Sequence, residues 1–235
     1  MIRLGAVVFA LALSAAAHAQ SAVVALIPGS GFNGAKASYV GRMTFTPDVW
    51  QGPGYETVPV PYRRGKAGLK DVLAGVRLVD SRHPDLPLCL YGESSGGAWA
   101  LQAAVRTGVV DCLIVVAGVT DQETLARSPF RLARHLGARI WPRYFGPAKA
   151  DGYFEPYDLW AGGAPDVPTL LAYGETDRVV PAQQGELLAG VAPAAELRVL
   201  RPGPRRFAHG RANASDFVRA REAAVALVEA QTTSP

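Results

Sequence analysis

The sequence has few of the residues that bind metals or cross-link small domains. It contains only two cysteines, Cys89 and Cys112, and four histidines, which are His18, His83, His135 and His209. They form no cluster with the spacing of zinc ligands, which argues against a metal site.

The chain also has only a small excess of positive over negative charge. The formal net charge is +4 and the basic residues are scattered, so the chain lacks the basic stripe that binds nucleic acid. Internal repeats and low-complexity tracts are absent. With 49% hydrophobic and 19% charged residues, the 235-residue chain has the composition of one globular domain. Disordered, collagen-like and multi-span membrane proteins are therefore excluded.

Long hydrophobic runs are limited to the start of the chain. Arg3 gives a positive start, Leu4–Leu13 is apolar, and Ala17-His18-Ala19 has the small-x-small pattern of a cleavage site. This layout predicts a secretory signal peptide over residues 1–19, because the apolar run is too short to span a bilayer comfortably. No cysteine follows the run to carry a lipid. We expect a mature domain over residues 20–235, secreted or periplasmic, without a stable membrane anchor.

The expected export affects whether the two cysteines can form a disulfide. Cys89 lies in Leu88-Cys89-Leu90 and Cys112 in Cys112-Leu113-Ile114, so both belong to apolar, strand-like runs. An oxidising compartment permits a disulfide between them. Two separate buried thiols that act as small hydrophobic residues fit the pattern equally well. The sequence leaves the pairing open.

Short apolar runs alternate with longer helical patterns along the chain. The runs predict strands over Ala22–Pro28, Glu56–Val60, Leu86–Tyr91, Asp111–Ala117, Val167–Tyr173 and Glu196–Leu200. Helices are expected around Leu69–Val79 and over Ser95–Thr107, Ala182–Ala189 and Ala214–Ala230. This alternation predicts an α/β fold with a mostly parallel sheet of about six strands and helices on both faces. Ligands of such sheets bind at the carboxyl ends of the strands.

One stretch interrupts the alternation. Residues 119–165 contain no clear strand and are rich in aromatic and basic side chains. A segment of this length inside a domain is usually functional rather than bare loop. We expect it to be a short insertion that covers the site, and we call it the cap segment.

The turn after the third predicted strand has the pattern G-x-S-x-G. It reads Gly92-Glu93-Ser94-Ser95-Gly96 and leads directly into a helix. In a nucleophile elbow the chain reverses sharply, and residues two positions from the serine must lack side chains to avoid a clash. The helix N-terminus behind the serine favours developing negative charge. Ser94 is therefore the predicted nucleophile.

A nucleophilic serine requires a base, and the base requires an acid that orients it. In this type of fold the chain order is serine, acid, histidine. Asp177 lies in the turn after the fifth strand and is the predicted acid, with Glu175, nearer the strand end, as the alternative. His209 is the only histidine after Asp177 and lies between the last strand and the last helix, so it is the predicted base.

An acyl intermediate also needs donors for its oxyanion. The first expected donor is the backbone N–H of Ser95, which follows the nucleophile. The second should come from the glycine-rich loop Pro28–Gly34 after the first strand, where Ser30 and Gly31 are the candidates. The sequence does not choose between them.

These motifs resemble those of a known superfamily. The elbow GESSGG is similar to the GESAGG of carboxylesterases, and the turn GETDRVVP and the late His209-Gly210 look like those of α/β-hydrolase esterases and lipases. The resemblance implies an α/β-hydrolase fold and a serine hydrolase acting on a small-molecule ester or acyl substrate without cofactor or metal. Two features differ: the family's leading antiparallel strands are absent, and the loop reads PGSG rather than HGGG.

Alternatives remain at this point. A serine peptidase of the same fold would use the same residues, and the machinery also serves thioesters and lactones. Residues 29–34 read GSGFNG and match the dinucleotide-binding pattern G-x-G-x-x-G, but the second strand ends without the acid that holds a ribose. A binding protein that kept the fold without activity is a third class, and the complete set of Ser94, Asp177 and His209 argues against it.

Overall fold

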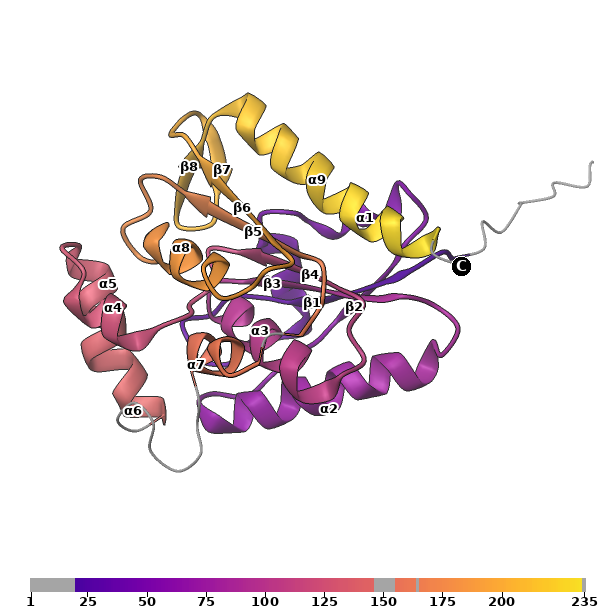
Figure 1. Ribbon diagram of the computed structural model, residues 1–235, viewed down its shortest axis with the longest axis horizontal. Helices are drawn as coiled ribbons and strands as arrows, with labels where there is room; N and C mark the ends of the chain where they lie inside the picture. The colour runs from indigo at the N-terminus through magenta and orange to yellow at the C-terminus, as the bar shows by residue number, and fades with distance from the viewer. Residues whose placement is uncertain (1–19, 146–154, 164, 234–235) are drawn as a thin grey trace, which may run out of the picture.

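Six parallel strands form the central sheet of the computed structural model, which describes residues 20–145, 155–163 and 165–233 (Figure 1). The strands are β1 (Val23–Ile27), β2 (Glu56–Pro59), β3 (Leu88–Glu93), β4 (Cys112–Val116), β5 (Thr169–Gly174) and β6 (Ala195–Leu200). They lie in the order β2-β1-β3-β4-β5-β6. The predicted α/β fold with a parallel sheet of about six strands is confirmed.

Burial explains which strands occupy the centre. Every residue of β1, β4 and β5 is buried, whereas β2 and β6 at the two edges are mostly half-buried or exposed. Near-continuous apolar strands need cover on both faces, and the edge strands tolerate polar side chains. Pro59 lies in edge strand β2, where a missing N–H costs no bond within the sheet.

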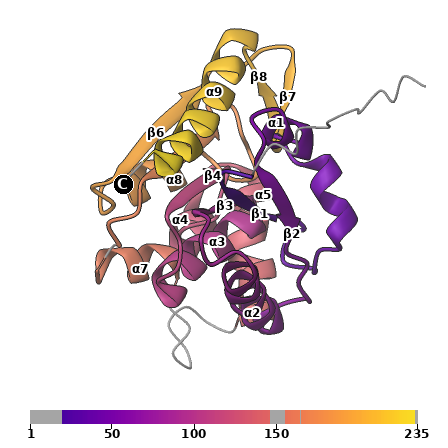
Figure 2. The same cartoon turned by 90° about the vertical axis from the view of Figure 1, so that its right-hand side faces the viewer.

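Helices cover both faces of the sheet. The main helical segments are η1 (Ala37–Arg42), α1 (Pro47–Gln51), α2 (Lys66–Arg82), α3 (Ser95–Thr107), α8 (Gln183–Ala189) and α9 (Ala214–Thr232). Helices α1 and α9 lie on one face, and α2 and α3 lie on the other (Figures 1 and 2). Helix α2 buries Val72, Val76 and Val79, leaves Leu69 and Leu73 half-buried, and ends before Pro84.

The cap segment is helical where the structure describes it. It forms α4 (Gln122–Arg127), α5 (Arg131–His135), the π-helical turn η2 (Leu136–Ile140), α6 (Trp141–Phe145) and α7 (Pro156–Ala161). Helices α4 to α6 project from one end of the sheet, whereas α7 lies beside α3 (Figure 1). The indole N–H of Trp160 in α7 donates to the Leu101 carbonyl of α3 at 3.1 Å. Residues 146–154 and 164 of the segment lie outside the described residues.

The open question about the cysteines is answered by the register of two central strands. Cys89 of β3 stands directly opposite Cys112 of β4, with their Cα atoms 4.5 Å apart, and the two form a disulfide. The predicted signal peptide, residues 1–19, lies outside the described residues. Among the helices of the described residues, none is long and apolar enough to cross a membrane.

Candidate active site

Ser94 lies in the sharp turn between β3 and α3. Its φ of +56° is a left-handed conformation that non-glycine residues rarely adopt. A Cβ on Gly92 would lie 2.6 Å from the Gly96 carbonyl oxygen, and a Cβ on Gly96 would overlap the carbonyl oxygen of Ile27. Gly29 of the neighbouring loop is equally constrained, because a Cβ there would lie 2.8 Å from Cβ of Ser94. The elbow therefore needs glycine at positions 92 and 96, and the neighbouring loop needs it at position 29.

The structure brings Ser94, His209 and Asp177 together from distant parts of the chain. Nε2 of His209 lies 2.9 Å from Oγ of Ser94, and Nδ1 of His209 lies 2.9 Å from Oδ2 of Asp177. Asp177 is buried, whereas the His209 side chain retains 22% exposure. A serine, an imidazole and a buried carboxylate in this order have the geometry of a proton-transfer chain that ends on the serine oxygen.

The second oxygen of Asp177 holds its own turn. Oδ1 accepts the backbone N–H of Val179 at 2.8 Å and that of Val180 at 3.0 Å. The carboxylate is therefore fixed with one oxygen toward the turn and the other toward His209. Glu175, the alternative acid, is exposed at the end of β5. The carboxylate that meets His209 is that of Asp177.

His209 occupies a hairpin that the sequence did not predict. Strands β7 (Arg205–Phe207) and β8 (Gly210–Ala212) pair antiparallel, apart from the main sheet, and His209 lies in the turn between them. Ala208 in the same turn has a φ of +42°, and its N–H donates to Oγ1 of Thr44 at 2.9 Å. The buried side chain of Phe207 anchors the hairpin to the core.

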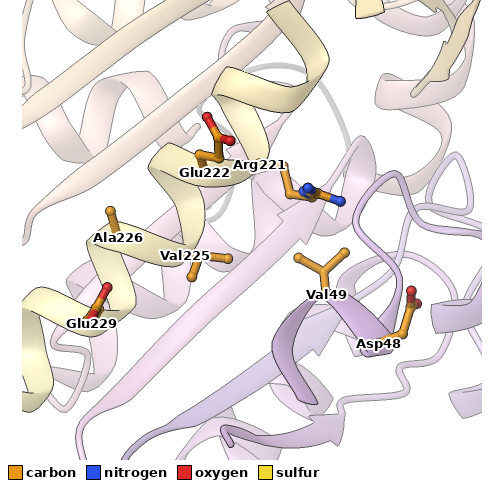
Figure 3. A pocket seen from close by; sticks show the side chains of 7 residues that line it. All are labelled: Asp48, Val49, Arg221, Glu222, Val225, Ala226 and Glu229. Atoms are coloured by element: carbon orange, nitrogen blue, oxygen red, sulfur yellow. The ribbon is translucent and has the colours of Figure 1, made fainter. Parts of the chain in front are cut away.

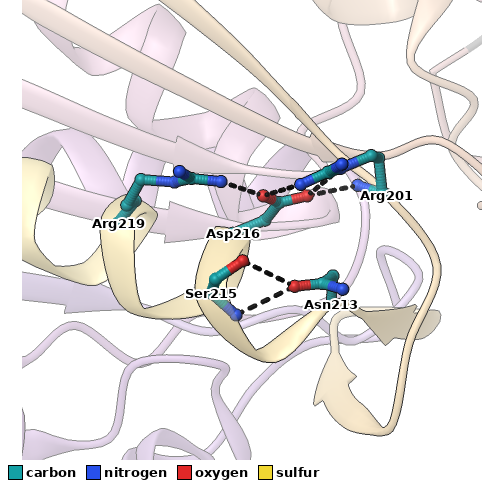
Figure 4. A network of polar contacts seen from close by, with 5 residues as sticks. All are labelled: Arg201, Asn213, Ser215, Asp216 and Arg219. Atoms are coloured by element: carbon teal, nitrogen blue, oxygen red, sulfur yellow. Dashed lines mark hydrogen bonds and ion pairs between the residues drawn. The ribbon is translucent and has the colours of Figure 1, made fainter.

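A polar network closes the base of this hairpin (Figure 4). The guanidinium of Arg201 pairs with Asp216 at 3.0 Å, and the Asn213 N–H donates to the Arg201 carbonyl at 2.6 Å. The Asn213 side chain also accepts the Ser215 N–H at 2.9 Å and so begins α9. Hydrogen bonds from Arg201 first, and then from Arg219, hold the pKa of Asp216 well below its usual value. The network fixes the point at which the hairpin leaves the body of the protein.

The predicted oxyanion loop packs directly against the elbow. The Ser30 N–H donates to Oγ of Ser95 at 2.9 Å, so the Ser30 donor is engaged by a side chain in this structure. Tyr62, which no sequence motif indicated, joins the two segments. Its hydroxyl donates to the Pro28 carbonyl at 2.7 Å and lies 3.1 Å from Oγ of Ser95. Burial raises the pKa of Tyr62 and keeps it a neutral donor.

Tyr62 could have been suspected from the sequence, because it follows the carboxyl end of a predicted strand, where site residues gather.

Gly31, the other candidate oxyanion donor, has a φ of +61° in the loop after β1. The next residue, Phe32, is buried between Trp99 of α3 and Trp141 of α6, with ring centroids 5.3 and 5.2 Å apart. The cap segment therefore contacts the loop beside the nucleophile.

A recess of about 260 Å³ opens beside Ser94. The loop after β1, η1 and the elbow supply its lining, which consists of Pro28, Gly29, Ser30, Tyr39, Arg42, Met43 and Glu93. A separate hollow of about 390 Å³ lies between α1 and α9 (Figure 3), lined by Asp48, Val49, Arg221, Glu222, Val225, Ala226 and Glu229. That hollow includes neither Ser94 nor His209 nor Asp177. The lining of the recess contains none of the three either, but it includes Glu93 and Gly29, which lie directly beside Ser94, so the recess is the candidate substrate site.

The loop geometry also bears on the dinucleotide interpretation of GSGFNG. The fingerprint requires the glycine loop to open a helix. Here the loop packs on the elbow, and the next helical segment is the short 3₁₀ turn η1, which begins only at Ala37. Within the described residues, no group of three or more histidine, cysteine, aspartate or glutamate side chains is placed to hold a metal ion.

Comparison with known proteins agrees with the fold. A family model described as "Serine aminopeptidase, S33" matches residues 59–154, a stretch that includes Ser94 and ends before Asp177 and His209. No curated protein matches the sequence. Three similar solved structures are an α/β-hydrolase superfamily protein from Enterococcus faecalis, an esterase from Pyrococcus furiosus, and a soluble variant of monoglyceride lipase from Saccharomyces cerevisiae.

The three structures resemble this chain in architecture rather than in sequence. The Enterococcus protein has 14% identity and a TM-score of 0.66, with 91% of this chain and 92% of the other covered. The Pyrococcus esterase has 16% identity and a TM-score of 0.64, with 91% and 84% covered. The yeast lipase has 14% identity and a TM-score of 0.61, with 91% and 88% covered. The three structures show that this chain has the α/β-hydrolase fold.

Proposed function

We propose that the chain is a serine hydrolase that cleaves carboxylic esters through an acyl-enzyme intermediate. The observation that carries the proposal is the continuous chain of contacts from Asp177 through His209 to Ser94, with both distances at 2.9 Å. Hydrogen-bonded contacts of this kind activate a serine that is otherwise a weak nucleophile. The fold and the esterases and lipases that share it support a hydrolase.

In the proposed mechanism Nε2 of His209 takes the proton of Ser94 as Oγ attacks the ester carbonyl. Asp177 accepts a hydrogen bond from the Nδ1–H of His209, holds the imidazole in the required tautomer, and stabilises the imidazolium that forms. His209 then returns the proton to the leaving alcohol. Water repeats the sequence on the acyl-enzyme and releases the acid.

The oxyanion is assigned to backbone donors around the elbow. The Ser95 N–H at the start of α3 is the first, and the Ser30–Gly31 loop supplies the second. Ser30 can serve only by exchanging its bond to Oγ of Ser95 for a bond to the substrate, and Gly31 is the other candidate. Both choices therefore stay within the proposal.

Two further parts of the proposal concern access and location. The contact between Trp141 and Phe32 supports a cap segment that packs on the loop beside the nucleophile, whereas the residues that line the recess lie outside that segment. The sequence of residues 1–19 supports export, and so does the Cys89–Cys112 disulfide, because disulfides persist in oxidising compartments. We assign the protein to the periplasm or the extracellular space.

A serine peptidase is the second candidate, and one observation favours it. The family model that matches residues 59–154 is described as a serine aminopeptidase. Amide and ester substrates share the same chemistry at the carbonyl, so the two functions differ in the leaving group and in the shape of the recess.

A panel of p-nitrophenyl esters with varied acyl length, run beside aminoacyl p-nitroanilides, tests the proposal. We expect turnover of short esters by the mature protein and loss of that turnover in Ser94→Ala. Ser81→Ala is the matched control, since this serine lies on α2 and its hydroxyl donates to the Leu78 carbonyl of the same helix. Preferential turnover of the anilides would replace the esterase by the peptidase, and unchanged activity in Ser94→Ala would reject the proposed nucleophile.

A further inference from the structure

Glu93, immediately before the nucleophile, contacts a segment far away in the sequence. Its Oε2 accepts the backbone N–H of Thr44 at 2.6 Å and the hydroxyl of Tyr91 at 3.1 Å. The Tyr91 hydroxyl in turn accepts the N–H of Phe45 at 3.1 Å. Two consecutive backbone N–H groups are thus held by two side chains of β3, so Thr44 and Phe45 are fixed relative to the elbow.

The side chain of Thr44 extends this connection to the histidine. Its Oγ1 accepts the N–H of Ala208 at 2.9 Å, across 164 positions of sequence. Ala208 precedes His209 and has the unfavourable φ of +42°. The contacts therefore run from Glu93, beside the nucleophile, through Thr44 to the backbone that carries His209.

The hairpin of His209 needs such a tie. A two-stranded hairpin outside a larger sheet is marginally stable by itself, and β7 and β8 pair only with each other. The base of the hairpin is held by Arg201, Asn213 and Asp216, whereas the N–H of Ala208 is the backbone group next to His209 that another segment binds. Without this bond, the base of the hairpin and the buried side chain of Phe207 would stay in place, but the backbone next to His209 would lose its hydrogen bond to another segment.

We propose that Thr44 is a positioning residue that fastens the His209 turn to the nucleophile elbow. Glu93 holds Thr44 by its backbone, and Thr44 holds Ala208 by its hydroxyl oxygen. The bond keeps Nε2 of His209 within hydrogen-bond distance of Oγ of Ser94. Like the triad roles, the inference rests on the proposed function.

Three variants separate positioning from general stability. Thr44→Val keeps the shape of the side chain and removes the acceptor of the Ala208 N–H, whereas Thr44→Ser retains that acceptor. Thr169→Val is the matched control, because its buried hydroxyl donates to the Val167 carbonyl at 2.8 Å at the amino end of β5, away from the site. Thr44→Ala replaces Thr44→Val if the latter does not fold.

Misplacement of a catalytic group mainly lowers the rate of the chemical step. We therefore expect Thr44→Val to lower kcat on the best ester at least about tenfold, with KM changed by less than about twofold. Thr44→Ser should restore most of kcat, and Thr169→Val should keep it. Amide hydrogen exchange gives a readout that does not depend on turnover. The Ala208 N–H should exchange faster in Thr44→Val, while the amides of β3 keep their protection.

The outcomes are distinct. Wild-type kcat in a folded Thr44→Val protein would overturn the positioning role, and so would an equal loss of kcat in Thr169→Val. Unchanged exchange at Ala208 would show that the bond itself does not hold the turn. Failure of the proposed function would appear differently, as a wild-type protein that turns over none of the esters, and the role of Thr44 would fall with it.

Discussion

Replacing Asp177 by asparagine tests the proposed catalytic triad of Ser94, His209 and Asp177 with little disturbance of the fold. The geometry decides which asparagine atom faces the histidine. The backbone N–H groups of Val179 and Val180 both require an acceptor where Oδ1 now lies. The amide oxygen must take that place, so the NH₂ group points at Nδ1 of His209.

The consequence is a change of tautomer. An NH₂ donor opposite Nδ1 makes that nitrogen an acceptor and leaves the proton on Nε2, where the proton of Ser94 would have to go. In serine proteases the same exchange lowers kcat by about 10⁴-fold, which corresponds to about 5.4 kcal/mol of transition-state stabilisation. Stability should change by only about 1–2 kcal/mol, because both bonds to the turn persist.

The assay is ester turnover beside thermal unfolding for Asp177→Asn and Glu175→Gln. We expect a loss of several orders of magnitude in kcat for the first variant and wild-type kcat for the second, since Glu175 is exposed. A folded Asp177→Asn protein with full activity would refute the assignment, and loss of activity in Glu175→Gln would move the acid to that residue.

Three further predictions concern stability. Burial raises the pKa of Glu155 from its usual 4.5 to about 8, so the folded state holds this proton more tightly than the unfolded state. The free energy of unfolding should therefore fall by roughly 2–5 kcal/mol between pH 4.5 and 8, and Glu155→Gln should flatten this part of the profile. Reducing the Cys89–Cys112 disulfide should lower the free energy of unfolding by about 3 kcal/mol, and the reductant should have no effect on the double alanine variant. Gly96→Ala, whose Cβ would overlap a carbonyl of β1, should lower stability by about 1–3 kcal/mol and abolish turnover, whereas Gly41→Ala, with open space around it, should do neither.

Much of the fold could be predicted because the central strands are continuous apolar runs. β1, β3, β4 and β5 all fall inside the predicted ranges or within two residues of them. Ser94 could be located because its constraints are local: a strand, two glycines and a helix within a few residues. Asp177 and His209 followed from chain order and from the scarcity of histidine rather than from any local pattern.

The features that the sequence did not reveal depend on long-range contacts. The hairpin β7–β8 has strands of three residues with exposed arginines and no apolar alternation. The disulfide depends on the register of two strands, which composition does not encode. Thr44 and Tyr62 lie in loops, and each acquires its place only when segments far apart in the sequence meet.

Covalent labelling of Ser94 tests the central claim most directly. The mature protein would be incubated with a fluorophosphonate, digested, and mapped by mass spectrometry. We predict one adduct, on the peptide that contains Ser94, and no adduct in Ser94→Ala. Well-folded protein that takes up no label, or a label on another residue that persists in Ser94→Ala, would contradict it.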